Sequence, residues 1–216
     1  MSVKATPLVR IDTFERLAVY GKLENLNLSG SVKYRTVARM LYDAVASGEL
    51  KEGMGIVEIT SGNTGIALAL RGKETGHPVK IITVKDATDQ AKRMMRSYGA
   101  EVIETTGWFK DGVEIVNEMM AREPDMWYWT KQTSNPSSLS SNNDLGAEIA
   151  RQMKAQFSAS VDVYVGSAES GSTLSGVARA LKLVNPKVVV YRVVPPEGQE
   201  YGFAEYNILP ATIFCW

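Results

Sequence analysis

Three polar segments carry side chains whose types and spacing could do chemistry. In "NLSGSVKYR" (27–35), Lys33 follows a turn of small residues and opens a segment of helical period. In "TSGNTG" (60–65) and "ESGST" (169–173), a glycine-containing loop joins a predicted strand to a predicted helix. Glycines let the backbone turn sharply near a ligand, and a helix N-terminus favours an anion. The two loops therefore predict anion-binding sites, although either loop alone could be a tight polar turn without a ligand.

Lys33 lies at the wrong end of a helix for its charge. The positive end of the helix dipole disfavours an ammonium group and so favours the neutral amine, which can act as a nucleophile or Schiff-base partner. The alternative is a solvated lysine that tolerates a small penalty. A reactive lysine together with two anion-binding loops indicates a phosphorylated aldehyde cofactor, pyridoxal phosphate.

Composition excludes several other chemistries. His77 is the only histidine and Cys215 the only cysteine, which excludes an internal disulfide and a metal site built from several such ligands. A Ser-His-Asp triad would need His77, which lies in "ETGHPVK" and is better interpreted as a turn residue. The P-loop and G-x-G-x-x-G patterns of nucleotide-binding α/β proteins do not occur, so that alternative is poorly supported.

Charge and hydropathy limit which partners and which cellular location are expected. Lysine plus arginine (24) balances aspartate plus glutamate (24), so neither a nucleic-acid nor a membrane-surface partner is expected. No apolar run approaches the ~20 residues that span a bilayer, and "MSVKATPLVR" lacks a signal-peptide core. The scarcity of cysteine favours a reducing, cytoplasmic location.

Apolar runs rich in β-branched residues alternate with segments of helical period. The predicted strands are 6–12, 17–25, 55–60, 79–84, 101–105, 126–130, 161–165 and 187–194. The predicted helices are 32–47, 64–74, 89–99, 112–123, 146–156 and 173–184. The buried stripe of the first helix should comprise Val37, Ala38, Leu41, Ala44 and Val45. Such alternation predicts an α/β fold with a largely parallel sheet flanked by helices on both faces.

Two segments interrupt this rhythm. The serine- and asparagine-rich "KQTSNPSSLSSNND" (131–144) is interpreted as a flexible linker or a binding loop between two halves. The last residues, "EGQEYGFAEYNILPATIFCW" (197–216), are apolar and aromatic without a clear period. A domain seldom ends on exposed side chains of this kind, so we expect the chain to stop inside a core.

The motifs "KLENLNLSGSVKYR" and "VEITSGNTGIALAL" together resemble the paired signature of the cysteine synthase family. These are fold-type II pyridoxal-phosphate enzymes, also called the tryptophan-synthase-β type. Similarity continues through "RMMRSYGAEVI", "KQTSNP", "LGAEIARQ" and "TLSGVARALK" to the last residues, where the B branch of the family is most similar. The resemblance implies a two-lobed fold, with a smaller lobe at 27–135 and a second, incomplete lobe formed by 1–26 and 136–216.

The resemblance also implies roles for individual residues. Lys33 would form the internal aldimine and move the Cα proton, and Asn63 would hydrogen-bond the cofactor's ring hydroxyl. The substrate carboxylate would be held by Thr60, Ser61, Thr64 and Gln132. The phosphate would be surrounded by Ser170, Gly171, Ser172 and Thr173. The implied reaction is β-elimination from an activated serine such as O-acetylserine, followed by sulfide addition to give cysteine, in a homodimer.

Several residues depart from the family pattern. Tyr34 replaces an aspartate, Leu28 replaces the usual proline or its neighbour, and Thr133 replaces a phenylalanine. Glu169 stands in the phosphate loop, where a like charge ~5 Å from the phosphate would cost roughly 3 kcal/mol at an effective dielectric near 20. The chain also stops where the family continues, and the family's pyridine-nitrogen serine has no counterpart here. The alternative is therefore a non-catalytic or regulatory protein, or a truncated relic, on the same scaffold.

Overall fold

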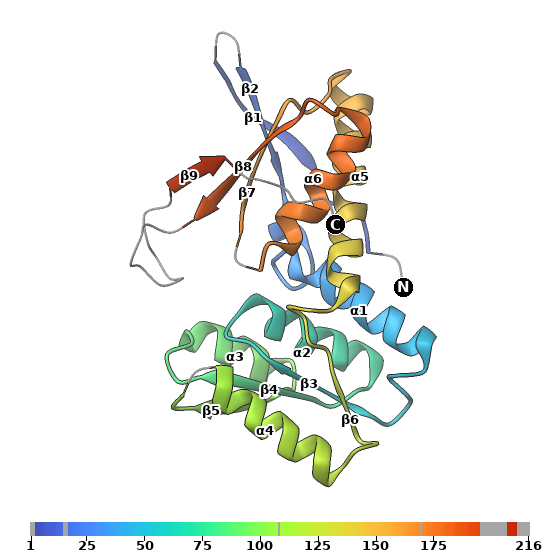
Figure 1. Ribbon diagram of the computed structural model, residues 1–216, viewed down its shortest axis with the longest axis vertical. Coiled ribbons are helices and arrows are strands. Elements are labelled where there is room, and N and C mark those ends of the chain that lie inside the picture. Colours follow the sequence, from blue (N-terminus) through green and yellow to red (C-terminus); the bar gives the residue numbers. More distant parts are fainter. Residues whose placement is uncertain (1–2, 15–16, 108, 169, 195–206, 211–216) are drawn as a thin grey trace. The chain divides into compact units, whose positions relative to one another are not determined.

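The computed structural model describes residues 3–14, 17–107, 109–168, 170–194 and 207–210. The chain divides into two compact units, which are considered separately (Figure 1). Unit 1 combines Met1–Thr6 with Glu24–Asn135, and unit 2 combines Pro7–Leu23 with Pro136–Trp216. The first residues therefore group with the unit that contains Lys33, and only the segment 7–23 joins the C-terminal half. Glu169 and most of the apolar end of the chain lie outside the described residues.

A four-stranded parallel sheet forms the centre of unit 1. Its strands, in the order β5-β4-β3-β6, are β5 (Glu101–Thr105), β4 (Val79–Val84), β3 (Gly55–Ile59) and β6 (Trp127–Trp129). The helices between them are α2 (Asn63–Thr75), α3 (Asp89–Ser97) and α4 (Phe109–Arg122), and α1 (Lys33–Ser47) precedes β3. The parallel sheet and its helices confirm the α/β class predicted from the alternating pattern.

Both faces of this sheet are covered by helices. Successive strand residues point to opposite faces, so alternate residues of β3 pack into different clusters. Ile56 packs into one cluster with residues of α1, α2 and α3, whereas Val57 and Ile59 pack with Val116 of α4. The predicted stripe of α1 is buried except for Val45, which is 56% exposed. Val45 lies in the last turn of α1, and Met40, which the predicted stripe did not include, is 1% exposed.

Unit 2 contains a hairpin, a mixed sheet and two helices. Strands β1 (Leu8–Phe14) and β2 (Leu17–Lys22) pair antiparallel, which confirms the predicted strand pair. Strand β7 (Val163–Ser167) pairs parallel with β8 (Val189–Val194), and β9 (Asn207–Pro210) pairs antiparallel with β8. The short β9 was not apparent from the sequence, because the end of the chain has no alternating pattern.

The interpretation of residues 131–144 as a linker or loop is wrong for most of that segment. Helix α5 (Pro136–Phe157) begins within it and packs against α6 (Ser172–Val184). Proline is compatible with the first helical position, and close packing overrides the low helix propensity of serine and asparagine. A Cβ atom added to Gly176 of α6 would lie 2.8 Å from the carbonyl oxygen of Leu139 and 2.5 Å from Cβ of Asn142. Helices α5 and α6 therefore come so close at Gly176 that α5 needs small side chains there.

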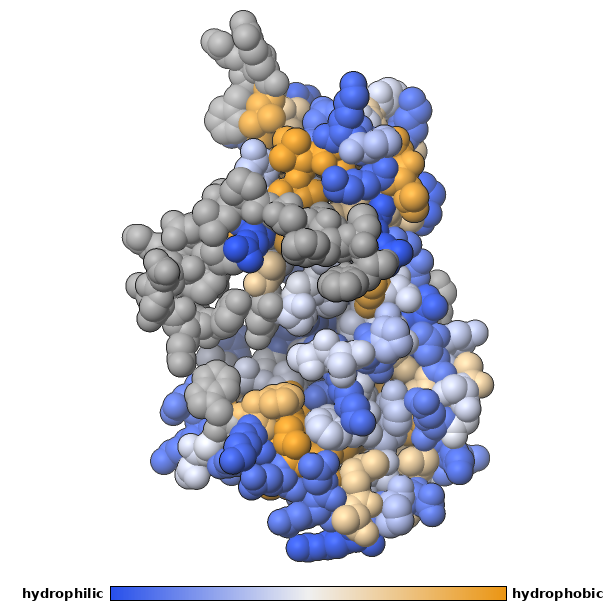
Figure 2. Space-filling model, viewed as in Figure 1, coloured by the Kyte–Doolittle hydropathy of each residue, from blue (hydrophilic) through white to orange (hydrophobic). Residues whose placement is uncertain are grey.

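The surface carries both polar and apolar side chains, as Figure 2 shows for one face. Exposed apolar residues of unit 2 include Val163 and Val165 of β7 and Val189 of β8. In the described part of the chain, no helix is long and apolar enough to cross a membrane. The same residues contain no group of three or more histidine, cysteine, aspartate or glutamate side chains that could hold a metal ion.

Candidate functional site

The strand order of unit 1 places two polar loops next to each other. From β3 the chain moves to β4 and β5 on one side, and then crosses to β6 on the other side of β3. The carboxyl ends of β3 and β6 flank the point where this direction changes, which is where parallel α/β sheets bind ligands. The loop that begins at Thr60 follows β3, and the loop that begins at Thr130 follows β6.

A side-chain hydrogen bond joins these loops. Thr64, which is buried in the first turn of α2, donates its hydroxyl to Oε1 of Gln132 at 2.9 Å. Thr60 is fixed by its backbone N–H, which donates to the carbonyl oxygen of Ile82 at 3.0 Å. Ser61 and Asn63 are exposed on the same loop, and Asn63 is the first residue of α2. Four residues expected to bind a substrate carboxylate, Thr60, Ser61, Thr64 and Gln132, thus lie on the two loops that flank one point of the sheet.

Glu58 supports the second loop from inside the sheet. This β3 residue is 2% exposed, and its Oε2 accepts hydrogen bonds from the Thr130 hydroxyl and, at 2.9 Å, from the Gln132 backbone N–H. Its Oε1 accepts from the N–H of Ile59 at 2.7 Å. Burial raises the pKa of Glu58, and the hydrogen bonds from Thr130, Gln132 and Ile59 oppose that shift only in part. The only sequence signal for Glu58 is a charged residue within an apolar strand.

Between Thr130 and Gln132, the two loop residues that donate to Glu58, the backbone adopts a left-handed conformation. Lys131 has φ 48°, which costs a residue other than glycine about 1–2 kcal/mol. Such a conformation persists only where neighbouring contacts fix it. Here the bonds from Thr130 and Gln132 to Glu58 lie on either side, and Asn135 donates its side-chain amide to the carbonyl oxygen of Thr130 at 2.9 Å.

Lys33 is the first residue of α1, as the sequence predicted. The turn before it requires a glycine, since Gly30 has φ 76° and its N–H closes onto the carbonyl oxygen of Asn27 at 2.8 Å. The hydroxyl oxygens of Ser29 and Ser31 are buried without a hydrogen-bond partner among the described residues. Buried hydroxyls usually have partners, so this pair leaves polar capacity beside Lys33.

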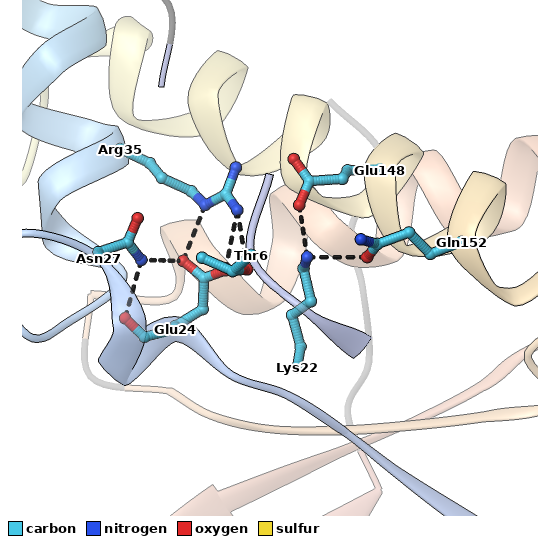
Figure 3. Close-up of polar contacts among 7 residues, drawn as sticks. All are labelled: Thr6, Lys22, Glu24, Asn27, Arg35, Glu148 and Gln152. Atoms are coloured by element: carbon cyan, nitrogen blue, oxygen red, sulfur yellow. Dashed lines mark hydrogen bonds and ion pairs between the residues drawn. The ribbon is translucent and has the colours of Figure 1, made fainter. Parts of the chain in front are cut away.

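A buried ion pair holds the beginning of α1 (Figure 3). Arg35 donates from Nε to Oε2 of Glu24 at 2.8 Å and from Nη2 to Oε1 at 3.0 Å. The same carboxylate accepts from the hydroxyl of Thr6 at 2.6 Å and from the amide of Asn27 at 2.7 Å. Arg35 is only two residues from Lys33, so this network fixes the turn that presents the lysine. The sequence motif contained these residues, but their pairing was not evident from it.

The path of the chain predicts that Lys33 lies toward the carboxyl edge of the sheet. Residues 48–54 connect the end of α1 to the beginning of β3, so α1 runs against the direction of β3. The end of α1 therefore lies near the beginning of β3, and its first turn lies toward the other edge. Helices α1 and α2 also pack against each other. This path predicts that Lys33 and the loop 60–65 lie at the same edge of unit 1.

The expected phosphate loop belongs to unit 2. Gly171 precedes α6 with φ 80°, and Ser172 and Thr173 are the first residues of that helix. The hydroxyl oxygens of Ser170 and Ser172 are 3.3 Å apart. The first backbone N–H groups of α6 have no intrahelical acceptor, which suits an anion. In the same unit, Lys22 of β2 bonds to Glu148 and, at 2.8 Å, to Gln152 of α5 (Figure 3).

Comparison with known families decides the wider assignment. The family described as "Pyridoxal-phosphate dependent enzyme" matches residues 1–206. The chain belongs to this family. Its cofactor is pyridoxal phosphate, and the resemblance inferred from the two motifs is confirmed.

Individual members of the pyridoxal-phosphate dependent family agree with this assignment. Cysteine synthase of Aquifex aeolicus is 33% identical over 231 residues, which cover 97% of this chain and 69% of that protein. Cysteine synthase A of Escherichia coli is 32% identical over 185 residues, which cover 84% of this chain and 56% of that protein. The chain thus spans 69% of the length of one of these relatives and 56% of the length of the other.

Solved structures confirm the fold-type II architecture. O-ureido-L-serine synthase superposes with a TM-score of 0.82 at 31% identity, covering 90% of this chain and 61% of the other. A hydrogen sulfide-producing enzyme from Fusobacterium nucleatum gives 0.83 at 29% identity, covering 90% and 64%. Cysteine synthase from Entamoeba histolytica gives 0.81 at 31% identity, covering 89% and 59%. Similar folds in this family therefore carry differently named activities.

The residues of this chain fit the family cofactor. Within the described part of the chain, the hydroxyls of Ser29 and Ser31 have no hydrogen-bond partner, which leaves polar capacity beside Lys33. The left-handed Gly171 precedes a helix N-terminus, which suits an anion. The departure at Tyr34 is accommodated away from the lysine's loop. Its hydroxyl lies 3.4 Å from Oε2 of Glu74 on α2, and the Arg71 guanidinium lies 5.7 Å from its ring centroid. The departure at Glu169 lies outside the described residues.

Proposed function

We propose that this protein catalyses pyridoxal-phosphate-dependent β-replacement on an activated serine such as O-acetylserine, with sulfide as the nucleophile and cysteine as the product. The observation that carries the proposal is the pairing of Thr64 with Gln132 where the strand order changes direction, at the edge of the sheet where Lys33 is expected to lie. The cysteine synthases among the relatives support this choice of reaction.

The chain's own residues would act in three groups. Lys33 would carry the cofactor and accept the proton from Cα of the substrate at its Nζ atom. Asn63 would hydrogen-bond the ring hydroxyl. The substrate carboxylate would be bound by Thr60, Ser61, Thr64 and Gln132. When bound, pyridoxal phosphate supplies an electron sink for the carbanion left on Cα.

The phosphate is assigned to the first turn of α6. Ser170 and Ser172 offer hydroxyls, Gly171 provides the left-handed turn, and Thr173 continues the helix with a further hydroxyl. The N-terminal N–H groups of α6 complement the negative charge. The four side chains carry no positive charge of their own, so the phosphate would be held mainly by backbone and hydroxyl donors.

Cofactor attachment is tested by adding pyridoxal phosphate to the protein and recording visible absorbance. Borohydride reduction followed by peptide mass spectrometry should place the label on Lys33, and Lys33→Ala should remove both the absorbance and any β-elimination. Lys51→Ala is the matched control, because Lys51 is an exposed lysine just beyond the other end of α1. A reducible adduct that persists in Lys33→Ala would assign the attachment to another lysine.

The reaction itself is tested by incubating the loaded protein with O-acetylserine and sulfide and measuring cysteine. Production of hydrogen sulfide and formation of O-ureidoserine should be measured beside it, because relatives with similar folds are named for those activities. Light scattering tests the expected homodimer, and fractionation of the source cells tests the expected cytoplasmic location.

A second candidate is a protein of this scaffold that does not catalyse the reaction. The sequence feature that favours it is the negative charge of Glu169 beside the assigned phosphate loop. Titration with pyridoxal phosphate distinguishes the two candidates. Failure to bind the cofactor, with Glu169→Gly restoring binding, would favour the non-catalytic candidate.

A further inference from the structure

We propose that Glu58 is a positioning residue for the substrate carboxylate. Its buried carboxyl group holds the loop after β6 so that the side chain of Gln132 meets Thr64. The inference rests on the proposed function, in which Thr64 and Gln132 bind that carboxylate.

The location of Glu58 is unusual for a residue with only a packing role. Strands of a parallel sheet that are covered on both faces favour apolar residues, and the rest of β3 is Gly55, Ile56, Val57 and Ile59. A buried carboxyl group is unfavourable unless hydrogen bonds compensate for its lost hydration. Glu58 obtains them from the loop after β6 as well as from its own strand.

The two contacts at Oε2 determine where Gln132 lies. One comes from the Thr130 hydroxyl, and the other from the Gln132 backbone N–H at 2.9 Å. Between them Lys131 adopts the left-handed conformation with φ 48°. Without the carboxyl group, the carbonyl oxygen of Val57 in β3 still accepts the Thr130 N–H at 3.3 Å, but the left-handed conformation loses the two bonds that flank it. Gln132 would then leave its 2.9 Å contact with Thr64.

Glu58 acts through Gln132 and is not expected to touch the substrate. Its side chain is 2% exposed, and both of its oxygens accept hydrogen bonds from the protein. A proton-transfer role would need an oxygen that reaches the reacting atoms. The expected consequence of its loss is therefore weaker substrate binding with little change in the chemical step.

The test uses two substitutions at Glu58 and one control in the neighbouring strand. Glu58→Met keeps an unbranched chain of similar length without an acceptor. Glu58→Gln keeps one amide oxygen, which can accept the hydrogen bonds from the Thr130 hydroxyl and the Gln132 N–H. The control is Thr83→Val in β4, because Thr83 is equally buried and its hydroxyl has no partner among the described residues.

Two readouts are needed, and one of them does not depend on turnover. Amide hydrogen exchange on the cofactor-free protein should be at least about tenfold faster at Gln132 in Glu58→Met, since that N–H loses its acceptor. In the loaded enzyme, KM for the amino-acid substrate should rise about tenfold and kcat should stay within about twofold. This pattern is expected when the lost interaction stabilises the bound substrate and the transition state equally. Glu58→Gln should recover most of both effects, and Thr83→Val should match the wild type.

Three results would overturn the inference: an unchanged KM in folded Glu58→Met, a fall in kcat without a change in KM, or equal impairment of Glu58→Gln and Glu58→Met. If Glu58→Met does not fold, Thr130→Val removes one of the contacts at Oε2 and should raise KM about threefold. An unchanged KM in that variant would also refute it. If the wild type turns over no amino acid, the proposed function fails, and an unchanged exchange rate of Gln132 in the variants then decides separately against Glu58.

Discussion

Replacement of Arg35 by methionine should be one of the most destabilising single changes in unit 1. The Arg35 and Glu24 side chains are only 8% and 16% exposed, and they share two hydrogen bonds of 2.8 and 3.0 Å. Removing one partner of a buried pair costs about 3–5 kcal/mol, because the other charge stays buried. Thr6 and Asn27 continue to donate to Glu24, so the lower end, about 3 kcal/mol, is expected.

The assay is urea unfolding followed by tryptophan fluorescence, which reports on unit 1 through Trp127 and Trp129 of β6. With an m-value of about 2 kcal/mol per molar, the midpoint should fall by about 1.5 M. Arg39→Met is the matched control on the same helix. Its ion pair with Asp43 has side chains 39% and 33% exposed, so its loss should cost about 0.5 kcal/mol or less.

A double substitution separates the charge from the packing. Glu24→Gln combined with Arg35→Met removes the carboxylate that Arg35→Met alone leaves without its cation, so the double variant should be more stable than Arg35→Met. The reasoning is refuted if Arg35→Met costs no more than Arg39→Met. It is equally refuted if adding Glu24→Gln to Arg35→Met lowers the stability further.

Three further predictions concern packing and titration. Gly176→Ala should destabilise unit 2 by about 1–3 kcal/mol in a thermal melt, because the new Cβ would lie 2.5 Å from Cβ of Asn142. Burial raises the pKa of Glu58 above its usual 4.5, so the folded chain keeps a proton that the unfolded chain loses. The stability of the wild type relative to Glu58→Gln should thus be greatest below about pH 4.5 and decline as the pH rises, as measured by urea titrations. Hydrogen bonds from Lys92 and Arg96 lower the pKa of Glu104, so its contribution should be present at neutral pH and disappear as the pH falls below about 4.5, where Glu104→Gln should match the wild type.

The local pattern of the sequence was sufficient for the α/β class and for most elements, because amphipathic period and strand composition are local properties. It failed at α5, where serine and asparagine indicate a loop unless a partner helix packs close to them. The partner supplies Gly176, which is distant in sequence from Asn142 and Leu139. A pattern that depends on two helices together is not visible in either helix alone.

In the candidate site, too, the features that are local in sequence could be predicted, and the contacts between distant residues could not. Lys33 and the Thr60–Gly65 loop were recognisable because each motif is continuous in sequence. Glu58 was overlooked, since its role depends on Thr130 and Gln132, which are 72 and 74 positions away. The pairing of Arg35 with Glu24 was likewise hidden, because the motif specified the residues without specifying which side chains meet.

The division of unit 2 between two distant segments has a consequence for the order of folding during synthesis. The β1–β2 hairpin leaves the ribosome first, but Lys22 meets its partner Glu148 126 residues later, and β1 packs against α5. Residues 24–135 of unit 1 are complete before α5 emerges, apart from the short segment already synthesised at the N-terminus. Once that unit has folded, it fixes the distance between the points where the chain enters and leaves it. The entropy of closing this long loop has then largely been lost already, and the hairpin can join α5 as if the intervening residues were a short, rigid connection.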